Sequence, residues 1–160
     1  MTIKAGERMP AGKFKFMGED GPQELTTAQL FDGKRVALFS VPGAFTPTCS
    51  AKHLPGYIDH AADLRAKGVD TIACMSVNDV YVMGAWGKSA GAGEAVLMLA
   101  DGSGEYARAL GLELDLMSAG LGMRGQRFAL LVDNGVATKV HVEAAGEFKV
   151  SAADYLLGQL

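Results

Sequence analysis

Residues 36–49 have the sequence VALFSVPGAFTPTC. The first six form a short apolar run that Pro42-Gly43 ends, which is typical of a central β-strand buried on both faces. The loop that follows leads into a helical pattern that continues to Lys67, directly before a glycine. We expect a kink or a break in this helix at Pro55-Gly56. The stretch therefore predicts a strand that delivers Cys49 to the first turn of a helix.

Further strands are expected downstream. Apolar runs between turn residues indicate buried strands over residues 69–77, 96–100 and 128–133. Asn134-Gly135 is a strong signal for a two-residue hairpin, so the last of these strands should pair with residues 137–143.

Helical patterns alternate with these strands. Asn78 or Asp79 can cap a helix that runs through Trp86, and a short helix is expected over residues 104–110. The segment Ser151-Ala152-Ala153-Asp154 resembles a capping box that opens a C-terminal helix. This order of elements predicts an α/β layered domain, in which a central mixed sheet is flanked by helices. A thioredoxin-like fold fits the order.

The composition limits the classes of function. The chain has 160 residues, of which 49% are apolar and 21% charged, and its formal net charge is −3. It is long enough to bury one core, so we expect a single domain over residues 1–160. The charge gives no basic surface for nucleic acid or for an anionic membrane. No signal peptide and no run of about 20 apolar residues is found, so we expect a cytoplasmic protein that acts on small molecules or proteins.

The chain has two cysteines, Cys49 and Cys74. Two are too few for a disulfide framework or a cysteine-based zinc site. His60 and His141 lie far apart and no phosphate-binding fingerprint occurs, so we expect neither a metal nor a cofactor.

The position of Cys49 predicts a reactive thiol. With Thr46 as the N-cap and Pro47 at the first helical position, Cys49 lies at the third position, near the positive end of the helix. A helix end contributes only about 0.3 to 1 kcal/mol to an anion, so a thiolate also needs a nearby cation. The candidates are Arg124, Arg127, Lys52 and His53.

The residues around Cys49 resemble the active-site segment of peroxiredoxins, specifically of the type II or peroxiredoxin-5 group. The resemblance covers nearly the whole chain, because several later blocks occur in the same order. The matching blocks are PGAFTPTCS at 42–50, KHLPG at 52–56, SVND at 76–79 with Trp86, LELDL at 112–116 and RFALLVD at 127–133.

The resemblance implies an antioxidant oxidoreductase, a thiol-dependent peroxidase that reduces hydrogen peroxide and organic hydroperoxides. Cys49 is then the peroxidatic nucleophile, which becomes a sulfenic acid, and Thr46 is the hydroxyl that bonds the sulfur and the peroxide. Pro42 shields the pocket from water. Arg127 supplies the cation, in preference to Arg124, because it directly precedes the strand that resembles the family block.

The family also implies a thioredoxin fold and a homodimer whose partner helps to form the wall of the pocket. On this reading Phe45, Leu121 and Phe128 line an apolar mouth. Alternation along a strand gives a weaker statement: Arg127 and Ala129 face one way, and Phe128 and Leu130 the other.

Ionisation of the thiol cannot by itself explain a fast peroxidase. A free thiol is already a few per cent ionised at pH 7, so complete ionisation gains only about 30-fold. Most of the rate must come from holding the peroxide in line with the sulfur and from stabilising the departing oxygen.

The sequence leaves open how the sulfenic acid is reduced. Cys74 lies 25 residues after Cys49, a spacing that resembles the plant-type members and would suit a resolving cysteine. It also lies within the apolar run of residues 71–76, where a cysteine is commonly a small buried hydrophobe. Reduction by glutathione with glutaredoxin, or by thioredoxin, has equal weight.

Two other functions and one other role remain as alternatives. A thiol-disulfide oxidoreductase normally has Cys-x-x-Cys at the helix start, whereas this chain has Thr46 in the place of the first cysteine. A non-catalytic redox sensor would use oxidation of Cys49 only as a signal. His53 could form a Cys-His pair, but we expect it to be a polar residue at the surface.

Overall fold

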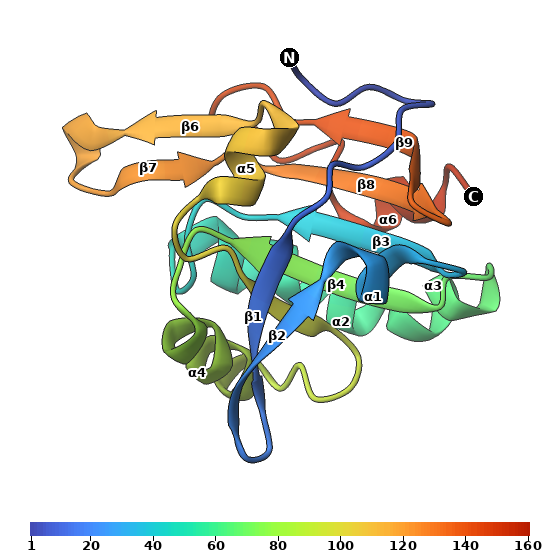
Figure 1. Ribbon diagram of the computed structural model, residues 1–160, viewed down its shortest axis with the longest axis horizontal. Helices are drawn as coiled ribbons and strands as arrows, with labels where there is room; N and C mark the ends of the chain where they lie inside the picture. The colour runs from blue at the N-terminus through green and yellow to red at the C-terminus, as the bar shows by residue number, and fades with distance from the viewer.

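A seven-stranded mixed sheet forms the centre of the molecule in the computed structural model, which describes residues 1–160 (Figure 1). The strand order is β2-β1-β5-β4-β3-β8-β9. Strands β3, β4 and β5 run parallel, and the other pairs in the sheet are antiparallel. The predicted α/β class with a mixed sheet is confirmed. The strands are β1 Lys13–Gly18, β2 Gly21–Thr26, β3 Arg35–Ser40, β4 Thr71–Ser76, β5 Leu97–Ala100, β8 Phe128–Asp133 and β9 Val136–Val142.

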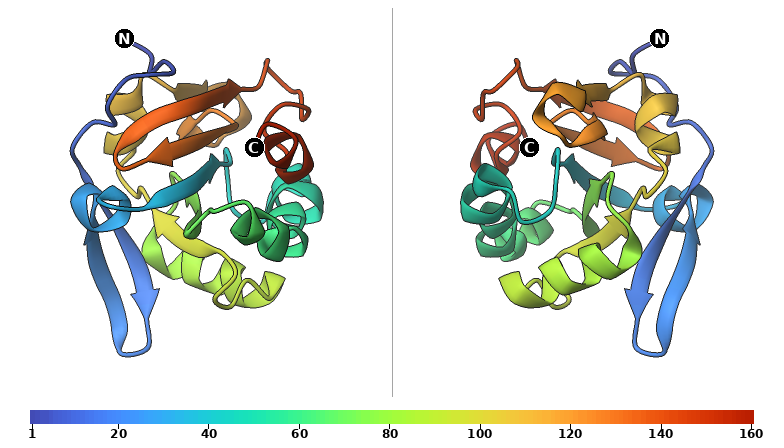
Figure 2. Two further views of the ribbon diagram at one scale, coloured as in Figure 1. Left: turned by 90° about the vertical axis from the view of Figure 1, so that its right-hand side faces the viewer. Right: turned by 90° about the vertical axis from the view of Figure 1, so that its left-hand side faces the viewer.

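Helices cover both faces of this sheet. The turned views show α2, α3 and α6 on one side and α1 on the other (Figure 2). A separate two-stranded sheet, β6–β7, projects from one end of the molecule (Figure 1). These elements are α1 Thr27–Phe31, α2 Leu54–Asp59, α3 Ala61–Ala66, α4 Val80–Ala90, α5 Glu105–Leu110, α6 Ala153–Leu157, β6 Glu113–Leu116 and β7 Gly122–Gly125.

The apolar side chains form two clusters, one on each face of the sheet. Ala37 and Phe39 of β3 pack into the first cluster, together with side chains of α2, α3, α4 and α6. Val36 and Leu38 pack into the second, with side chains of α1 and α5. Successive residues of a strand point to opposite faces, so a strand buried on both sides needs apolar residues on both faces. This explains why β3 has no polar alternation.

The hairpin predicted at Asn134-Gly135 is confirmed. Asn134 has φ 47° and Gly135 has φ 84°, as a type I′ turn requires at both central residues. Strand β8 has the bounds expected from its apolar run.

The helical segment after Cys49 is less regular than expected. Residues Cys49–His53 form a π-helical turn, in which the N–H of Leu54 donates to the carbonyl of Cys49. Pro55 follows directly and has no N–H for the i→i−4 bond, which favours such a local widening. The chain breaks again at His60, between α2 and α3. The expected interruption at Pro55-Gly56 is therefore a π-turn just before the proline and a break five residues after it.

Two expected caps have different outcomes. Asp79 caps α4, since its carboxylate accepts from the N–H of Val82 at 2.8 Å; the helix continues to Ala90 rather than ending at Trp86. The prediction of a capping box at Ser151 is wrong. Its hydroxyl donates to Glu143 Oε2 at 2.6 Å instead, and Ala152 is the N-cap of α6.

None of the helices is long and apolar enough to span a membrane.

Candidate active site

The loop between β3 and the first helical turn places Cys49 at the helix start. Phe45 has φ 64°, a left-handed conformation that is uncommon for a residue with a side chain. Pro47 is the first helical residue, and the carbonyl of Thr46 accepts from the N–H of Ser50 at 2.9 Å. Thr46 is thus the N-cap by position, as the sequence predicts, and Cys49 is the third helical residue.

The hydroxyl of Thr46 does not bond a helical N–H. It donates to the carbonyl of Gly43 at 2.7 Å, which uses its only proton. A hydroxyl has two lone pairs, so this oxygen can still accept a hydrogen bond from a ligand.

The segment at the end of β4 supports the same loop from the side. The N–H of Ala44 donates to Asn78 Oδ1 at 2.9 Å, and the hydroxyl of Ser76 lies 2.6 Å from the same oxygen. The sequence predicts Asn78 as a possible cap for α4 and as part of a family block, and neither prediction includes its role as a support for the loop.

Arg127 is the cation that reaches the sulfur. Its Nη2 donates to Cys49 Sγ at 3.1 Å, and its Nη1 lies 2.8 Å from His53 Nδ1. Cys49 is fully buried and belongs to the apolar cluster beneath α2 and α4. In such surroundings a charge-assisted hydrogen bond to sulfur is stronger than it would be in water.

Arg124 lies near the site but does not contact the sulfur. Its Nε donates to the carbonyl of Leu121 at 2.7 Å, and its Nη1 to the carbonyl of Pro42 at 3.3 Å. The structure thus separates the two arginines: Arg127 bonds the thiol, and Arg124 bonds the loop that precedes it.

His53 is not at the surface, contrary to our expectation. It is fully buried, and its Nε2 lies 3.0 Å from the carbonyl of Ser151 while Nδ1 faces Arg127. Burial and the neighbouring guanidinium lower its pKa from 6.5 to about 3, so the ring is neutral at physiological pH. Both nitrogens have partners, which excludes a Cys-His nucleophile pair in this arrangement.

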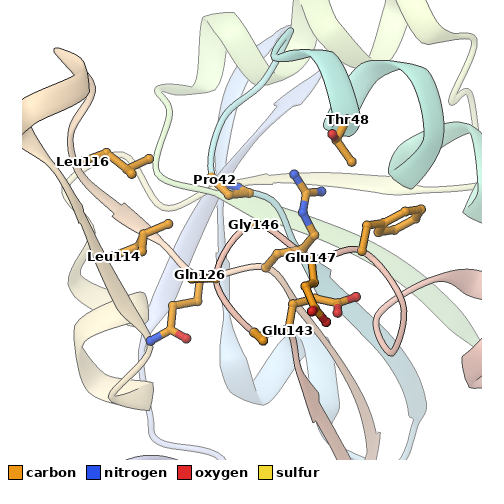
Figure 3. A pocket seen from close by; sticks show the side chains of 12 residues that line it. Pro42, Thr48, Leu114, Leu116, Gln126, Glu143, Gly146 and Glu147 are labelled. Atoms are coloured by element: carbon orange, nitrogen blue, oxygen red, sulfur yellow. The ribbon is translucent and has the colours of Figure 1, made fainter.

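A pocket of about 450 Å³ opens beside Arg127. Figure 3 shows Leu114 and Leu116 of β6 on one wall, Pro42 and Thr48 on another, and the loop with Gly146 and Glu147 opposite. Gln126, Glu143 and Phe148 also line the pocket, and the ring centroid of Phe148 lies 5.8 Å from Arg127 Cζ. The pocket is therefore partly apolar, and Arg127 is one of the residues that line it.

Of the three residues expected to line the apolar mouth of the pocket, Phe128 does not lie there. It is fully buried and packs in the cluster on the opposite face of the sheet from Arg127, as strand alternation requires. Phe45 and Leu121 are 54% and 37% exposed, and neither lines the pocket beside Arg127.

Cys74 lies in the middle of β4 and is fully buried. Its side chain is in the same apolar cluster as that of Cys49, and the two cysteines are not bonded to each other. Burial raises the pKa of the Cys74 thiol well above its usual value, and the charge of Cys49 raises it further.

Comparisons with known proteins show the family. A family model described as Redoxin matches residues 4–157. Peroxiredoxin-2B of Arabidopsis thaliana is 53% identical over 159 residues, which cover 99% of this chain and 98% of that protein.

Solved structures match as closely. Reduced Prx3 from Vibrio vulnificus in complex with H₂O₂ has a TM-score of 0.95 at 49% identity, with 99% of each chain covered. A Burkholderia cenocepacia protein provisionally described as a thioredoxin reductase has a TM-score of 0.98 at 44% identity, over 100% of this chain and 99% of that one.

Proposed function

This chain belongs to the peroxiredoxins of the Redoxin family and is a thiol-dependent peroxidase, and on this premise we propose that Cys49 reduces the peroxide through a sulfenic acid. The observation that carries the proposal is the contact of 3.1 Å between Arg127 Nη2 and Cys49 Sγ at a helix start. A thiolate is the nucleophilic form of cysteine, and both the guanidinium and the helix end favour that form.

In the proposed reaction the thiolate attacks the terminal oxygen of the hydroperoxide ROOH. The S–O bond forms as the O–O bond breaks, and the departing RO⁻ takes a proton to become an alcohol or, from hydrogen peroxide, water. The sulfur is oxidised by two electrons to a sulfenic acid.

Thr46 and Arg127 would hold the peroxide during this step. The hydroxyl of Thr46 keeps its lone pairs for the O–H of the peroxide, because its own proton is held by Gly43. Arg127 can donate to the oxygens as negative charge passes to the departing one. Pro42 lines the pocket next to them and would limit the entry of water.

We propose that organic hydroperoxides are substrates as well as hydrogen peroxide. The support is the pocket beside Arg127, where Leu114, Leu116 and Phe148 offer apolar surface to an organic tail. Hydrogen peroxide has no organic substituent and would contact only the groups around the sulfur.

For recycling we propose an external thiol, from glutathione with glutaredoxin or from thioredoxin. The thiol condenses with the sulfenic acid, which gives a mixed disulfide and water; a second thiolate then attacks this disulfide and releases Cys49. The full burial of Cys74 in a central strand supports an external partner over an internal one. A disulfide between the two cysteines would need their Cα atoms within about 7 Å.

A homodimer is proposed as the assembly. Exposed apolar side chains occur on the loop before Cys49 and on the β6–β7 hairpin, where a second copy could cover them. They are Phe45, Met117, Leu121 and Met123. Sedimentation analysis should give twice the mass of the chain; a monomer at micromolar concentration would contradict the proposal.

The cytoplasmic location and the single domain stay predictions, which cell fractionation and limited proteolysis would test.

The test of the chemistry is the intact mass after one equivalent of hydrogen peroxide. A gain of one oxygen, followed by a glutathione adduct when glutathione is added, is expected. No change in mass at Cys49 would contradict the proposed intermediate.

A further inference from the structure

The loop of residues 143–151 is closed by a single carboxylate oxygen. Glu143 Oε2 accepts from the N–H of Lys149 at 2.7 Å, the N–H of Ser151 at 2.8 Å and the hydroxyl of Ser151 at 2.6 Å. Burial alone would raise the pKa of Glu143, but the hydrogen bonds from Ser151 and Lys149 outweigh it and lower the pKa. The carboxylate is therefore ionised, and its Oε2 accepts three hydrogen bonds from the loop.

The loop presents one carbonyl to the buried side of α2. The carbonyl of Ser151 accepts from the hydroxyl of Tyr57 at 2.8 Å and lies 3.0 Å from His53 Nε2. The N–H and the hydroxyl of Ser151 are held by Glu143. Glu143 thus fixes the residue whose carbonyl meets the histidine.

The tautomer of His53 follows from its two partners. A guanidinium has only donors, so Nδ1, which lies 2.8 Å from Arg127 Nη1, must accept. The proton of the neutral ring is then on Nε2, which donates to the carbonyl of Ser151. If this carbonyl moved, the other tautomer would become available, and its Nδ1–H would oppose the N–H of Arg127.

A second contact joins the same loop to the same pair. The ring of Phe148 lies 5.0 Å from the ring of His53 between centroids, and 5.8 Å from Arg127 Cζ. The N–H of Glu143 also donates to the carbonyl of Arg127 at 3.0 Å. The loop therefore supports both members of the His53–Arg127 pair.

We propose that Glu143 and Ser151 are positioning residues for the peroxidase reaction: they hold His53 in its Nε2–H tautomer, and His53 in turn directs Arg127 to Cys49. The inference rests on the proposed function, since it explains how the guanidinium keeps its place beside the sulfur. Neither residue touches the sulfur; Glu143 lines the pocket beside Arg127, but its Oε2 is bonded to Lys149 and Ser151 of the loop.

The test is Glu143→Gln, which keeps the size of the side chain but removes its charge. Glu94→Gln is the matched control, because Glu94 is exposed and its side chain has no hydrogen bond or ion pair in the structure. Two quantities are measured in the reduced full-length protein: the ¹⁵N signature of the imidazole of His53, and the rate constant with hydrogen peroxide. The melting temperature is recorded for each variant.

The wild type and Glu94→Gln should show His53 as a single Nε2–H tautomer. Glu143→Gln should lose this single signature and react about 10- to 100-fold more slowly, as expected for a displaced catalytic group. A variant with a lower melting temperature but the tautomer and the rate constant of the wild type would overturn the proposal, because Glu143 would then only close the loop.

Ser151→Ala provides a second test if Glu143→Gln does not fold. It removes only the contact of 2.6 Å and should lower the rate constant about two- to ten-fold, with a mixture of tautomers. A single Nε2–H tautomer and an unchanged rate constant would count against the proposal. The ¹⁵N measurement needs no turnover, so an inactive wild type would contradict the proposed function while still testing the control of His53 by Glu143.

Discussion

Arg127 Nη2 lies 3.1 Å from Cys49 Sγ, although 78 residues separate the two in the chain. The other terminal nitrogen of the same guanidinium contacts His53. A guanidinium is planar and its donors have a fixed fork geometry, so two partners fix both the position and the orientation of the group. The peroxidase site is therefore built between the start of a helix and the start of β8.

The first prediction concerns the fork of Arg127. Arg127→Lys keeps the charge but cannot bond Cys49 and His53 together, and a hydrogen bond to a charged group is worth about 1.5–3 kcal/mol. We expect the rate constant with hydrogen peroxide to fall about 10- to 100-fold in stopped-flow measurements.

Arg65→Lys is the control for this substitution. Arg65 on α3 bonds the carbonyls of Glu94 and Ala95, away from the site, so the rate constant should stay at the wild-type value. Equal rate constants for the wild type and Arg127→Lys would show that charge alone is needed.

The second prediction is a loss of stability in acid because of His53. Its pKa is about 3 in the folded chain and 6.5 by its ordinary value, so between these values the unfolded chain binds more protons. The free energy of unfolding must therefore decrease as the pH falls from 6.5 towards 3. Between pH 6.5 and 4.5 the wild type should lose roughly 2 to 3 kcal/mol more than His53→Gln in urea unfolding.

His60→Gln serves as the matched control, since His60 is partly exposed beside Asp63. It should keep the acid sensitivity of the wild type. If His53→Gln were as sensitive to acid as the wild type, His53 would not be held neutral by burial.

Much of this site could be predicted from the sequence because local patterns determine it. The apolar run before Pro42-Gly43 predicts β3, and the proline after Thr46 predicts the helix start that holds Cys49. The direction of Arg127 follows from alternation along β8. The same alternation argues against Phe128 as a pocket residue, because Phe128 must point away from Arg127; the structure corrects that assignment.

The features of the site that the sequence does not predict depend on contacts between distant segments. His53 meets Ser151 across 98 residues, and no local pattern shows that this histidine is buried. The sequence predicts that the Ser151 hydroxyl caps α6, but a carboxylate eight residues earlier competes for it.

Two strand pairs are also absent from the sequence-based prediction. The β1–β2 hairpin has a local signal, since Lys13-Phe14-Lys15-Phe16 alternates with a period of two. The strands of β6–β7 have four residues each, and glycines within β7 weaken their pattern.

The third prediction concerns Cys74. Its thiol is buried in a central strand with a raised pKa, so it should not reduce the sulfenic acid of Cys49. Cys74→Ala should turn over peroxide with glutathione and glutaredoxin, or with thioredoxin, at no less than about half the wild-type rate. The small cavity that Cys74→Ala leaves in the core should lower the free energy of unfolding by about 1 to 2 kcal/mol.

Intact mass distinguishes the two routes of recycling. A loss of two hydrogens after one equivalent of peroxide, mapped to Cys49 and Cys74, would show internal resolution and contradict this prediction.

The fourth prediction concerns the pocket beside Arg127. Leu116→Ser removes apolar surface from one wall, and each buried CH₂ of a ligand is worth about 0.8 kcal/mol. We expect kcat/KM for cumene hydroperoxide to fall roughly 5- to 30-fold. The loss with hydrogen peroxide should be much smaller, because that substrate has no organic tail. Equal decreases in kcat/KM for both peroxides would show that the organic group of the hydroperoxide does not bind in this pocket.

The most direct test of the central claim is the reaction of the reduced chain with hydrogen peroxide in a stopped-flow instrument. Trp86 provides the signal, because its Nε1 donates to the hydroxyl of Ser50, the residue next to Cys49, at 3.1 Å. We predict a second-order rate constant several orders of magnitude above that of free cysteine in the wild type and in Cys74→Ser, and no reaction in Cys49→Ser. A wild-type rate constant equal to that of free cysteine would contradict a peroxidase site formed by Cys49, Thr46 and Arg127.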